Sequence, residues 1–320
     1  ILFLRYLGDH ELYLNGHLLQ KNKTYVLNNG SSIRNNKIKP IYYSNIVSRF
    51  AIDRIKEKIL FEVKNVEFKF KGGKIGLHNI SFTQESGQLV GIMGASGAGK
   101  STLLNVLNGT GKPSAGNVLI NDFDIHNQKD IVEGLIGFVS QDDLLIEELT
   151  VFQNLYYNAK LCFDNYSEPQ IVDVVDRMLM SLGLHEIKGM KVGSPLNKKI
   201  SGGQRKRLNI ALELIREPAI LFLDEPTSGL SSRDSENILD LLKELTLKGK
   251  LVFVVIHQPS SDIFKMFDKL LILDTGGYLI YDGDPIESII YFKSRVQQAN
   301  WNESECTLCG NVNPEQIFNI

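Results

Sequence analysis

Residues 89–102 constrain this chain more than any other stretch, because they read LVGIMGASGAGKST. The first part is an apolar run that predicts a buried strand, and the apolar spacing after Lys100 predicts a helix. Between them lies the pattern G-x-x-x-x-G-K-S, in the strand–loop–helix context that a phosphate-binding loop requires. Its residues are Gly94, Ala95, Ser96, Gly97, Ala98, Gly99, Lys100 and Ser101, followed by Thr102.

The chemistry of this loop follows from its residue types. Glycines let consecutive backbone N–H groups turn toward phosphate oxygens without a Cβ clash, and the start of the following helix adds partial positive charge. Lys100 can reach the β- and γ-phosphates, and the Ser101 hydroxyl can bind Mg²⁺. A plain glycine-rich turn before a helix is the alternative, but the agreement of strand, loop and helix favours a nucleotide site.

Size and composition set wide limits on the rest of the chain. The 320 residues carry a net charge of −2, with 43% hydrophobic and 22% charged residues, which gives no reason to expect a nucleic-acid partner. The longest apolar runs are far shorter than the roughly 20 residues of a membrane helix. The chain begins with Ile rather than Met, so we expect it to be a fragment.

Three cysteines do not make a disulfide framework, which fits a reducing, cytosolic setting. Two of them, Cys306 and Cys309, are spaced like half of a zinc site, and the sequence contains no second half. Both lie in a polar C-terminal tail at 297–320.

Residues 1–58 differ from the rest of the chain. Short β patterns alternate with turns at Asn15-Gly16 and at 28–30, which predicts a small β-rich unit followed by a polar linker at 48–58. The pattern YLNGHLL…YVLNNGSSIR resembles the C-terminal half of a forkhead-associated (FHA) domain. The residues that such domains use for phosphothreonine would lie upstream of this pattern, so no ligand site is carried over. A β-rich appendage without a ligand is the alternative.

A second unit begins near residue 59. Alternating apolar and polar residues at 61–70 and 77–82 predict two antiparallel strands ahead of the phosphate loop. An aromatic ring in such a layer can stack on an adenine ring, and Phe70 is the first candidate, with Phe68 the second. The alternative is that both rings pack in the core, as strand aromatics usually do.

Gln141, the pair Asp224-Glu225 and His257 each come directly after an apolar run of strand length. The Gln141 amide oxygen can bind Mg²⁺ or position water, and Asp224 can bind Mg²⁺ directly or through water. Glu225 can act as the general base on the attacking water. A neutral His257 can contact the γ-phosphate or orient that water.

Residues 142–217 are predicted to form a mostly helical region. Near its end, Ser201 is a natural N-cap, and the two glycines before Gln204, Gly202 and Gly203, expose backbone N–H groups at a helix start. This pattern predicts a second anion site. The basic residues at 205–207 could indicate nucleic-acid binding, but we interpret them as a solvated or phosphate-facing side. The acidic residues around Gln141, which are Asp142, Asp143, Glu147 and Glu148, could be metal ligands, but we interpret them as a solvated or partner-facing surface.

Together these motifs resemble the nucleotide-binding domain of ATP-binding cassette (ABC) proteins over residues 61–294. The stretches SGGQRKRL, DEPTSGL and IHQPSSDIF are most similar to the G subfamily, whose ATPase domain precedes a membrane domain in the same chain. The resemblance implies an α/β fold: a P-loop NTPase (RecA-like) core with an antiparallel β layer and an inserted α-helical subdomain at about 142–217. This ATPase domain would span 59–296, after the small β-rich unit and linker at 1–58.

The resemblance also implies a mechanism. Two ATPase domains, from identical or paralogous chains, would close head to tail around two ATP molecules with Mg²⁺, so that 94–102 of one faces 201–204 of the other. Hydrolysis would drive a membrane domain, which places the chain at the cytoplasmic face of the cell membrane. The implied nucleotide contacts are Phe70, loop 94–102 and Ser201 to Gln204; the catalytic residues are Lys100, Gln141, Glu225 and His257; the metal ligands are Ser101, Gln141 and Asp224.

One residue departs from the family pattern: Ser231 stands where an aspartate is usual, in the loop that would link the two sites across the dimer. The alternative function is an ATP-operated switch in a soluble, non-transport ABC complex. The single cassette and the G-type motifs favour the transporter. A phosphate-loop kinase would not explain residues 201–204.

Overall fold

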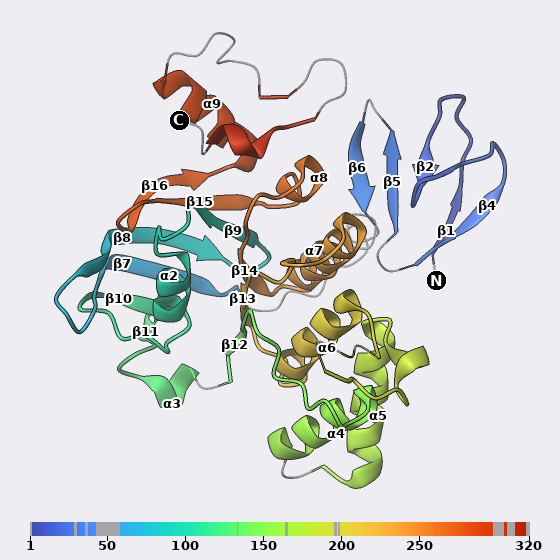
Figure 1. Ribbon diagram of the computed structural model, residues 1–320, viewed down its shortest axis with the longest axis horizontal. Helices are drawn as coiled ribbons and strands as arrows, with labels where there is room; N and C mark the ends of the chain where they lie inside the picture. The colour runs from blue at the N-terminus through green and yellow to red at the C-terminus, as the bar shows by residue number, and fades with distance from the viewer. Residues whose placement is uncertain are drawn as a thin grey trace.

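The computed structural model describes residues 2–28, 31–35, 38–42, 58–132, 134–163, 166–194, 197, 199–296, 304–305 and 311–317. Figure 1 shows a central sheet with helices packed on it, a helical lobe to one side, and a small β unit beside α7 (Ser232–Leu247) and α8 (Ser261–Phe264). Almost all of the predicted linker at 48–58 lies outside the described residues, and so do Cys306 and Cys309.

The N-terminal unit is β-rich, as predicted, with two small sheets in its described part. One pairs β1 with β4, and the other has the order β3-β2-β5-β6. At the predicted hairpin turn, Asn15 and Gly16 both adopt positive φ, which these two residue types tolerate best. The strands are β1 (Leu2–Arg5), β2 (Tyr13–Leu14), β3 (His17–Leu18), β4 (Thr24–Leu27), β5 (Ser32–Asn35) and β6 (Ile38–Tyr42).

The central sheet positions the predicted site. Among the described residues it has ten strands in the order β11-β10-β7-β8-β16-β15-β9-β14-β13-β12, of which the last five are parallel. These five strands therefore end at the same edge of the sheet. They are β15 (Lys269–Asp274), β9 (Leu89–Gly94), β14 (Leu251–Val255), β13 (Ile220–Asp224) and β12 (Ile136–Val139).

Helices cover both faces of this parallel part, which is why its strands are continuous apolar runs. Every residue of β9 and β14 is buried. Val252 and Val254 of β14 join the hydrophobic cluster that includes α7, whereas Phe253 joins the cluster on the opposite face with α2 (Lys100–Leu107). The Phe253 ring stacks on Phe222 of β13, with 4.9 Å between centroids.

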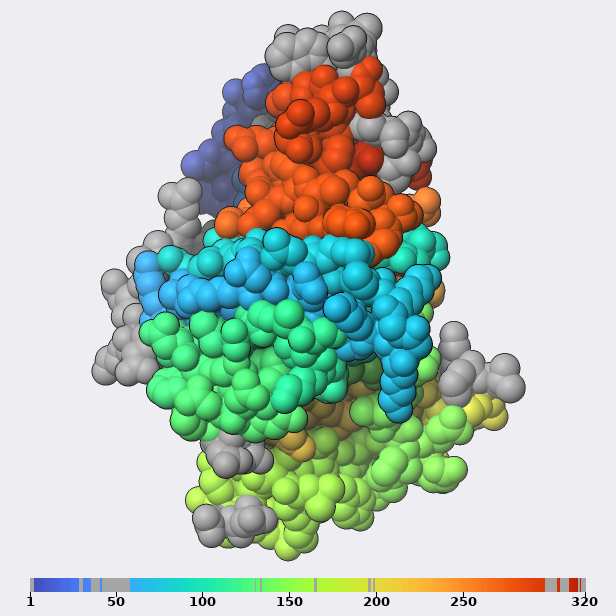
Figure 2. All heavy atoms as spheres, turned by 90° about the vertical axis from the view of Figure 1, so that its left-hand side faces the viewer, coloured from blue at the N-terminus to red at the C-terminus, as the bar shows by residue number. Residues whose placement is uncertain are grey.

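The predicted antiparallel layer lies beside this core. In Figure 2 its strands β7, β8 and β10 form the middle of one face, with the helical lobe below them. The layer meets the core at β16, which pairs with β15 and also pairs with β8, with Tyr278 opposite His78. The strands are β7 (Leu60–Lys69), β8 (Ile75–Glu85), β10 (Ala115–Ile120), β11 (Phe123–Asp124) and β16 (Tyr278–Gly283), and the short helix α3 (Lys129–Val132) follows β11.

The chain between β12 and β13 forms the predicted helical insertion. The Ser201 hydroxyl caps α6 by accepting the N–H of Gln204 at 3.2 Å, and Thr150 caps α4 in the same way. The interpretation of 205–207 as a solvated or phosphate-facing side is wrong for Arg205, which is only 5% exposed. The helices are α4 (Val151–Cys162), α5 (Glu168–Ser181), the 3₁₀ turn η2 (His185–Ile187) and α6 (Gly202–Leu214).

The C-terminal part of the described chain adds α9 (Pro285–Arg295) and the 3₁₀ turn η3 (Pro314–Ile317), which pack against each other. None of the helices within the described ranges is long and apolar enough to cross a membrane. The arrangement of sheet, insertion and N-terminal unit confirms the predicted α/β class, a P-loop NTPase core with an antiparallel β layer.

Candidate functional site

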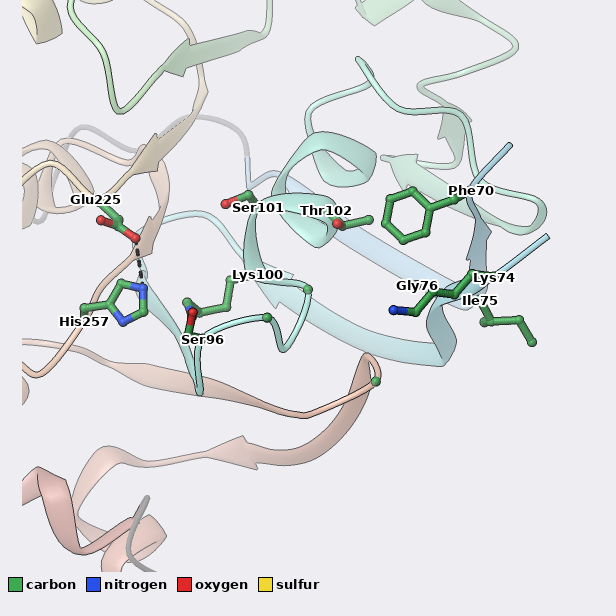
Figure 3. Close-up of a pocket in the computed structure, with 13 residues that line it drawn as sticks. Phe70, Lys74, Ile75, Gly76, Ser96, Lys100, Ser101, Thr102, Glu225 and His257 are labelled. Carbon is green, nitrogen blue, oxygen red and sulfur yellow. Dashed lines mark ion pairs between the residues drawn. The ribbon is translucent and has the colours of Figure 1, made fainter. Parts of the chain in front are cut away.

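A cavity of about 470 Å³ opens at the carboxyl ends of β9, β13 and β14. Figure 3 shows it with Glu225 and His257 at one end, the glycine-rich loop in the middle and Phe70 at the other end. It brings together half of the predicted site residues; Gln141, Asp224, Ser201 to Gln204 and three residues of the loop lie outside its lining. Its lining consists of Phe70, Lys74, Ile75, Gly76, Ser96, Gly97, Gly99, Lys100, Ser101, Thr102, Glu225, His257 and Gly276.

The loop backbone has the conformation that its glycines predict. Gly97 and Gly99 have φ of 78° and 95°, in the left-handed region that side chains disfavour. Gly99 also occupies the N-cap position of α2 without a side-chain cap. The first N–H groups of α2 therefore lie beside the cavity, and no N-cap side chain accepts a hydrogen bond from them.

The Lys100 ammonium group is held against the loop. It donates hydrogen bonds to the carbonyl oxygens of Gly94 and Ala95, both at 2.9 Å, and the residue is only 6% exposed. Burial lowers the pKa of Lys100, and the nearby carboxylates of Glu225 and Asp224 oppose that shift. A second cation, Lys74, lines the cavity from the turn between β7 and β8, and its side chain points toward the loop in Figure 3.

Asp224 lies at the end of β13, and one of its carboxylate oxygens accepts no hydrogen bond from any residue that the structure describes. Its Oδ1 is buried and has no hydrogen-bond partner among the described residues. Burial raises the pKa of this carboxyl group, Glu225 adds to the shift, and a hydrogen bond with Ser101 opposes it. An unpartnered carboxylate oxygen beside a hydroxyl fits Mg²⁺, which commonly takes one or two protein oxygens and fills its other positions with water and phosphate. In the part of the chain that the structure describes, no cluster of three or more His, Cys, Asp or Glu side chains offers a metal site made of protein ligands alone.

Glu225 is held in a fixed position between two neighbours. The His257 Nε2 lies 2.9 Å from Glu225 Oε1, and the Gln141 amide nitrogen donates to Oε2 at 3.3 Å. The Glu225 backbone has φ of 46°, a strained conformation for a side-chain-bearing residue, and such strain clusters at functional sites. The Gln141 side chain contacts Glu225 and is not part of the cavity lining, so its predicted metal contact stays a prediction.

Phe70 offers a ring to the far end of the cavity. It is 46% exposed, and its edge-on contact with Phe68, at 5.2 Å between centroids, leaves that neighbour packed against the core. Gly76 lies beneath the ring, where an added Cβ would come within 2.6 Å of Phe70 Cε2. Of the two predicted candidates, the cavity includes Phe70 and not Phe68.

Ser201, Gly202, Gly203 and Gln204 do not line this cavity. They form the start of α6, where Gly203 is buried and packs closely on the first turn of α7. A Cβ on Gly203 would come within 2.8 Å of Asp234 Oδ1. Ser231 caps α7 by accepting the Asp234 N–H at 3.1 Å, so the serine that departs from the family pattern has a local structural role.

Sequence reasoning missed four lining residues, Lys74, Ile75, Gly76 and Gly276. Lys74 lies in the turn between β7 and β8, β8 begins with Ile75 and Gly76, and Gly276 lies in the turn between β15 and β16. They reach the cavity because the His78 N–H bonds the Gly277 carbonyl at 2.9 Å, which brings the two turns together beside the loop. The available signal was the glycine content of the second turn: Gly277 has φ of 87°, and a Cβ there would lie 2.0 Å from the Gly76 carbonyl oxygen.

Comparisons with known proteins show which family this chain is similar to. The family model described as ABC transporter matches residues 77–228. The chain is 38% identical over 265 residues to ABC transporter G family member 28 of Arabidopsis thaliana, covering 80% of this chain and 23% of that protein. It is 42% identical over 192 residues to the ABC-type transporter claG of Penicillium crustosum, covering 60% of this chain and 26% of that protein.

Among solved structures, the chain is similar to CbiO1 of Clostridium perfringens, described as part of the ABC transporter complex CbiONQ. The TM-score is 0.64 at 28% identity, over 75% of this chain and 93% of that chain. The chain thus spans about a quarter of the length of the two curated relatives, but most of the solved ATPase component matches it.

Proposed function

Because the chain belongs to the ABC transporter family, as an ATPase domain of the G-family type, we propose that it works as half of a dimer. Two such domains close head to tail around two ATP molecules and drive a membrane domain. The observation that carries this proposal is the separation of two half-sites in one chain. The glycine-rich loop lines the cavity with residues 96–97 and 99–102, whereas the glycine-containing helix start at 201–204 lies outside it.

Within one chain, the cavity residues bind and orient ATP. Backbone N–H groups of the loop and of the first turn of α2 receive the phosphates, and Lys100 moves from its two carbonyl partners to the β- and γ-phosphates. The Phe70 ring takes the adenine, because it presents an exposed aromatic surface at the opposite end of the cavity. In this proposal the base lies at the Phe70 end of the cavity and the γ-phosphate at the Glu225 end.

Ser101 and Asp224 hold Mg²⁺, with Gln141 as the third candidate ligand. The unpartnered Oδ1 of Asp224 supports this assignment. The ion supplies charge neutralisation for the phosphate oxygens.

Glu225 is the proposed general base. Its carboxylate faces the cavity at the end where the γ-phosphate would lie, and it can accept a proton from the attacking water. His257, 2.9 Å away, orients this carboxylate and reaches the γ-phosphate from the next strand. Gln141 bonds the other carboxylate oxygen, so both oxygens are oriented before the substrate arrives.

The second chain completes each site. The start of α6 presents backbone N–H groups and the Ser201 hydroxyl, which is the donor set that a γ-phosphate needs. Closure removes water from the phosphates and strengthens every charge interaction there. Serine, glycines and glutamine at 201–204 thus act on the partner's nucleotide.

The proposed membrane partner docks on the helical lobe and the segment after β12. Leu144 and Ile146 are 71% and 53% exposed in that segment, and Leu161 at the end of α4 is 85% exposed. Exposed large apolar side chains on this lobe favour a protein partner. In this proposal the chain lies at the cytoplasmic face of a membrane.

The test is Glu225→Gln in the 320-residue chain. We expect this variant to bind ATP with wild-type affinity, to hydrolyse it at least 100-fold more slowly, and to accumulate as an ATP-bound dimer in size-exclusion chromatography. Glu186→Gln, which changes an exposed glutamate of η2, is the matched control and should hydrolyse ATP like the wild type. Unchanged turnover in Glu225→Gln would remove Glu225 as the base, and a strictly monomeric ATP complex would remove the dimer.

A further inference from the structure

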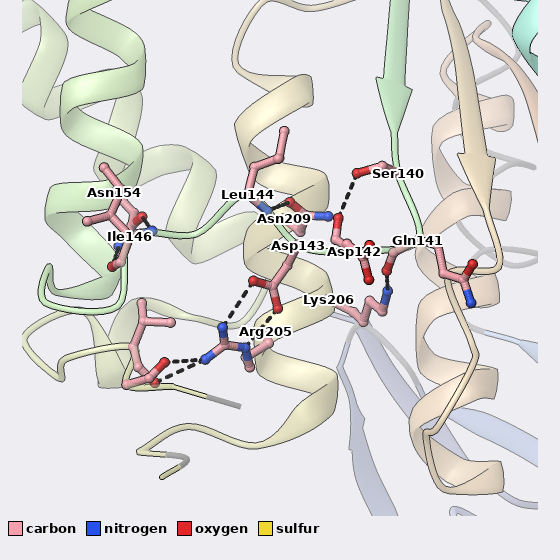
Figure 4. A network of polar contacts seen from close by, with 12 residues as sticks. Ser140, Gln141, Asp142, Asp143, Leu144, Ile146, Asn154, Arg205, Lys206 and Asn209 are labelled. Atoms are coloured by element: carbon pink, nitrogen blue, oxygen red, sulfur yellow. Dashed lines mark hydrogen bonds and ion pairs between the residues drawn. The ribbon is translucent and has the colours of Figure 1, made fainter. Parts of the chain in front are cut away.

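The segment that follows β12, residues 141–146, is fastened to α6 at three places. Figure 4 shows these contacts. The Lys206 ammonium group donates to the Gln141 carbonyl oxygen, and the Leu144 N–H donates to the Asn209 side chain at 3.3 Å. Between them, Arg205 forms a two-pronged ion pair with Asp143: Nε to Oδ2 at 2.9 Å and Nη2 to Oδ1 at 3.0 Å.

Arg205 is the most constrained of these side chains. It is 5% exposed, and its remaining Nη1 donates to the carbonyl oxygen of Gly193. A planar guanidinium held at both edges has little freedom to rotate, unlike a lysine in the same place. The basic residue that sequence reasoning assigned to a solvated or phosphate-facing side is therefore an internal connector.

Arg205 lies in the first turn of α6, directly after residues 201–204. Its backbone N–H donates to the Ser201 carbonyl oxygen at 2.9 Å, which is the first hydrogen bond of the helix. The guanidinium thus holds the same helical turn that begins at Ser201. On the other side, Asp143 lies two residues after Gln141, whose amide nitrogen bonds Glu225.

The segment has a second attachment, to α4. The Ile146 N–H donates to Asn154 Oδ1 at 2.8 Å, and the Asn154 amide returns a bond to the Ile146 carbonyl oxygen at 3.1 Å. Its backbone is thereby fixed, while Leu144 and Ile146 keep their side chains exposed. The segment is thus held by hydrogen bonds and an ion pair to α6 and by hydrogen bonds to α4.

We propose that Arg205 is a positioning residue for ATP hydrolysis, acting through Asp143. The pair fixes the angle between residues 141–146 and the helix start at 201–204, so a displacement of Gln141 at the chain's own nucleotide is passed to the half-site that serves the partner's nucleotide. This inference rests on the proposed function, because it needs residues 201–204 to act in the second chain. It adds a rigid link between the two half-sites of a single chain.

The test uses Asp143→Asn, which keeps the size of the side chain, removes its charge, and changes a group less buried than Arg205. The control is Asp176→Asn in the same lobe. Asp176 also accepts from a basic residue, Lys188, at 2.8 Å, and its side chain is 27% exposed against 23% for Asp143. Asp143→Glu, which keeps the carboxylate, is the rescue variant. Each change is made in the wild-type chain and in the Glu225→Gln chain.

Three quantities are measured: the dissociation constant for ATP of the monomer, kcat for hydrolysis, and the fraction of the Glu225→Gln chain trapped as a dimer by ATP. For Asp143→Asn we expect unchanged ATP affinity, a kcat lowered by about ten-fold, and a correspondingly smaller trapped fraction, as loss of a coupling contact predicts. Asp176→Asn should match the wild type in all three, and Asp143→Glu should recover most of kcat.

If Asp143→Asn has a normal kcat and a normal trapped fraction, the proposal is wrong. The proposed function would still hold in that case, provided that ATP traps the Glu225→Gln chain as a dimer. If Asp143→Asn and Asp176→Asn lower kcat equally, or if Asp143→Asn weakens ATP binding as well as lowering kcat, the Arg205–Asp143 pair only stabilises the fold. Either result would also overturn the proposal. If the Glu225→Gln parent itself never dimerises with ATP, the proposed function fails, and this inference fails with it.

Discussion

Removing the Asp224 charge should stabilise the nucleotide-free chain while abolishing its activity. Asp224→Asn keeps the shape of the side chain and removes a carboxylate whose Oδ1 is buried without a partner among the described residues. A buried polar atom of this kind costs about 1–3 kcal/mol. Because the amide must itself be accommodated in the same place, we expect a gain of about 1 kcal/mol, which for a domain of this size raises Tm by about 2 °C.

The pH dependence of this gain has a definite sign. The folded-state pKa of Asp224 is raised above the ordinary value of 3.8, mainly by burial, so folding favours the protonated carboxyl group. The stability from this group is present below the unfolded-state pKa and is lost as the pH rises through the raised folded-state pKa. The advantage of Asp224→Asn should therefore be small near pH 4 and reach its full size by about pH 7.

The assay is thermal and urea denaturation of the nucleotide-free chain at both pH values, with Asp173→Asn as control. Asp173 is an exposed carboxylate paired with Arg177 on α5, and its change should alter stability by only a few tenths of a kcal/mol. If Asp224→Asn proves less stable than the wild type near pH 7, or if its gain is largest near pH 4, then burial does not dominate the energetics of this carboxylate.

Two further predictions concern the ends of the cavity. Phe70→Ala should weaken ATP binding by about ten-fold, as loss of one ring stacked on a base does, and leave pyrophosphate binding unchanged, as titration calorimetry with both ligands would show. An unchanged ATP affinity would mean that the ring does not stack on adenine. Gly277→Ala should lower the free energy of unfolding by more than 1 kcal/mol, because its Cβ would lie 2.0 Å from the Gly76 carbonyl oxygen. Gly73→Ala is the control for backbone strain, because Gly73 has nearly the same φ but no atom of the described residues lies within 4 Å of a Cβ added there. If urea titrations show the same loss of unfolding free energy in both variants, the contact between the added Cβ and the Gly76 carbonyl oxygen has no energetic effect.

The residues that follow the parallel strands could be predicted from sequence, whereas the polar contacts between distant segments of the helical lobe could not. Gln141, Glu225 and His257 follow β12, β13 and β14, which are neighbours in the sheet, so residues far apart in the chain meet at one edge. Strand alternation could not separate Phe68 from Phe70, because β7 and β8 shift register between Phe68 and Lys69. The two rings therefore differ in burial despite their even spacing.

The contact between Arg205 and Asp143 joins residues 62 positions apart, and only the packing of the helical lobe brings them together. A run of three basic residues indicates a charged surface when it is read alone. What reverses that interpretation is the burial of one member on the inner face of α6. Likewise, Arg34 of β5 forms an ion pair with Asp262 of α8 at 2.6 Å. This contact joins the N-terminal unit to the ATPase core, and no local sequence pattern predicts it.

The central claim is that residues 94–102 of one chain meet residues 201–204 of another around ATP. The direct measurement mixes two single-cysteine chains in the Glu225→Gln background, one with Ser96→Cys and one with Gln204→Cys, after replacing the native cysteines by serine. A short bis-maleimide is added with and without ATP and Mg²⁺. We predict a covalent heterodimer that forms in the mixture only when nucleotide is present, and in neither chain alone. A mixture that stays monomeric with ATP bound, or that cross-links equally without it, would contradict the composite site.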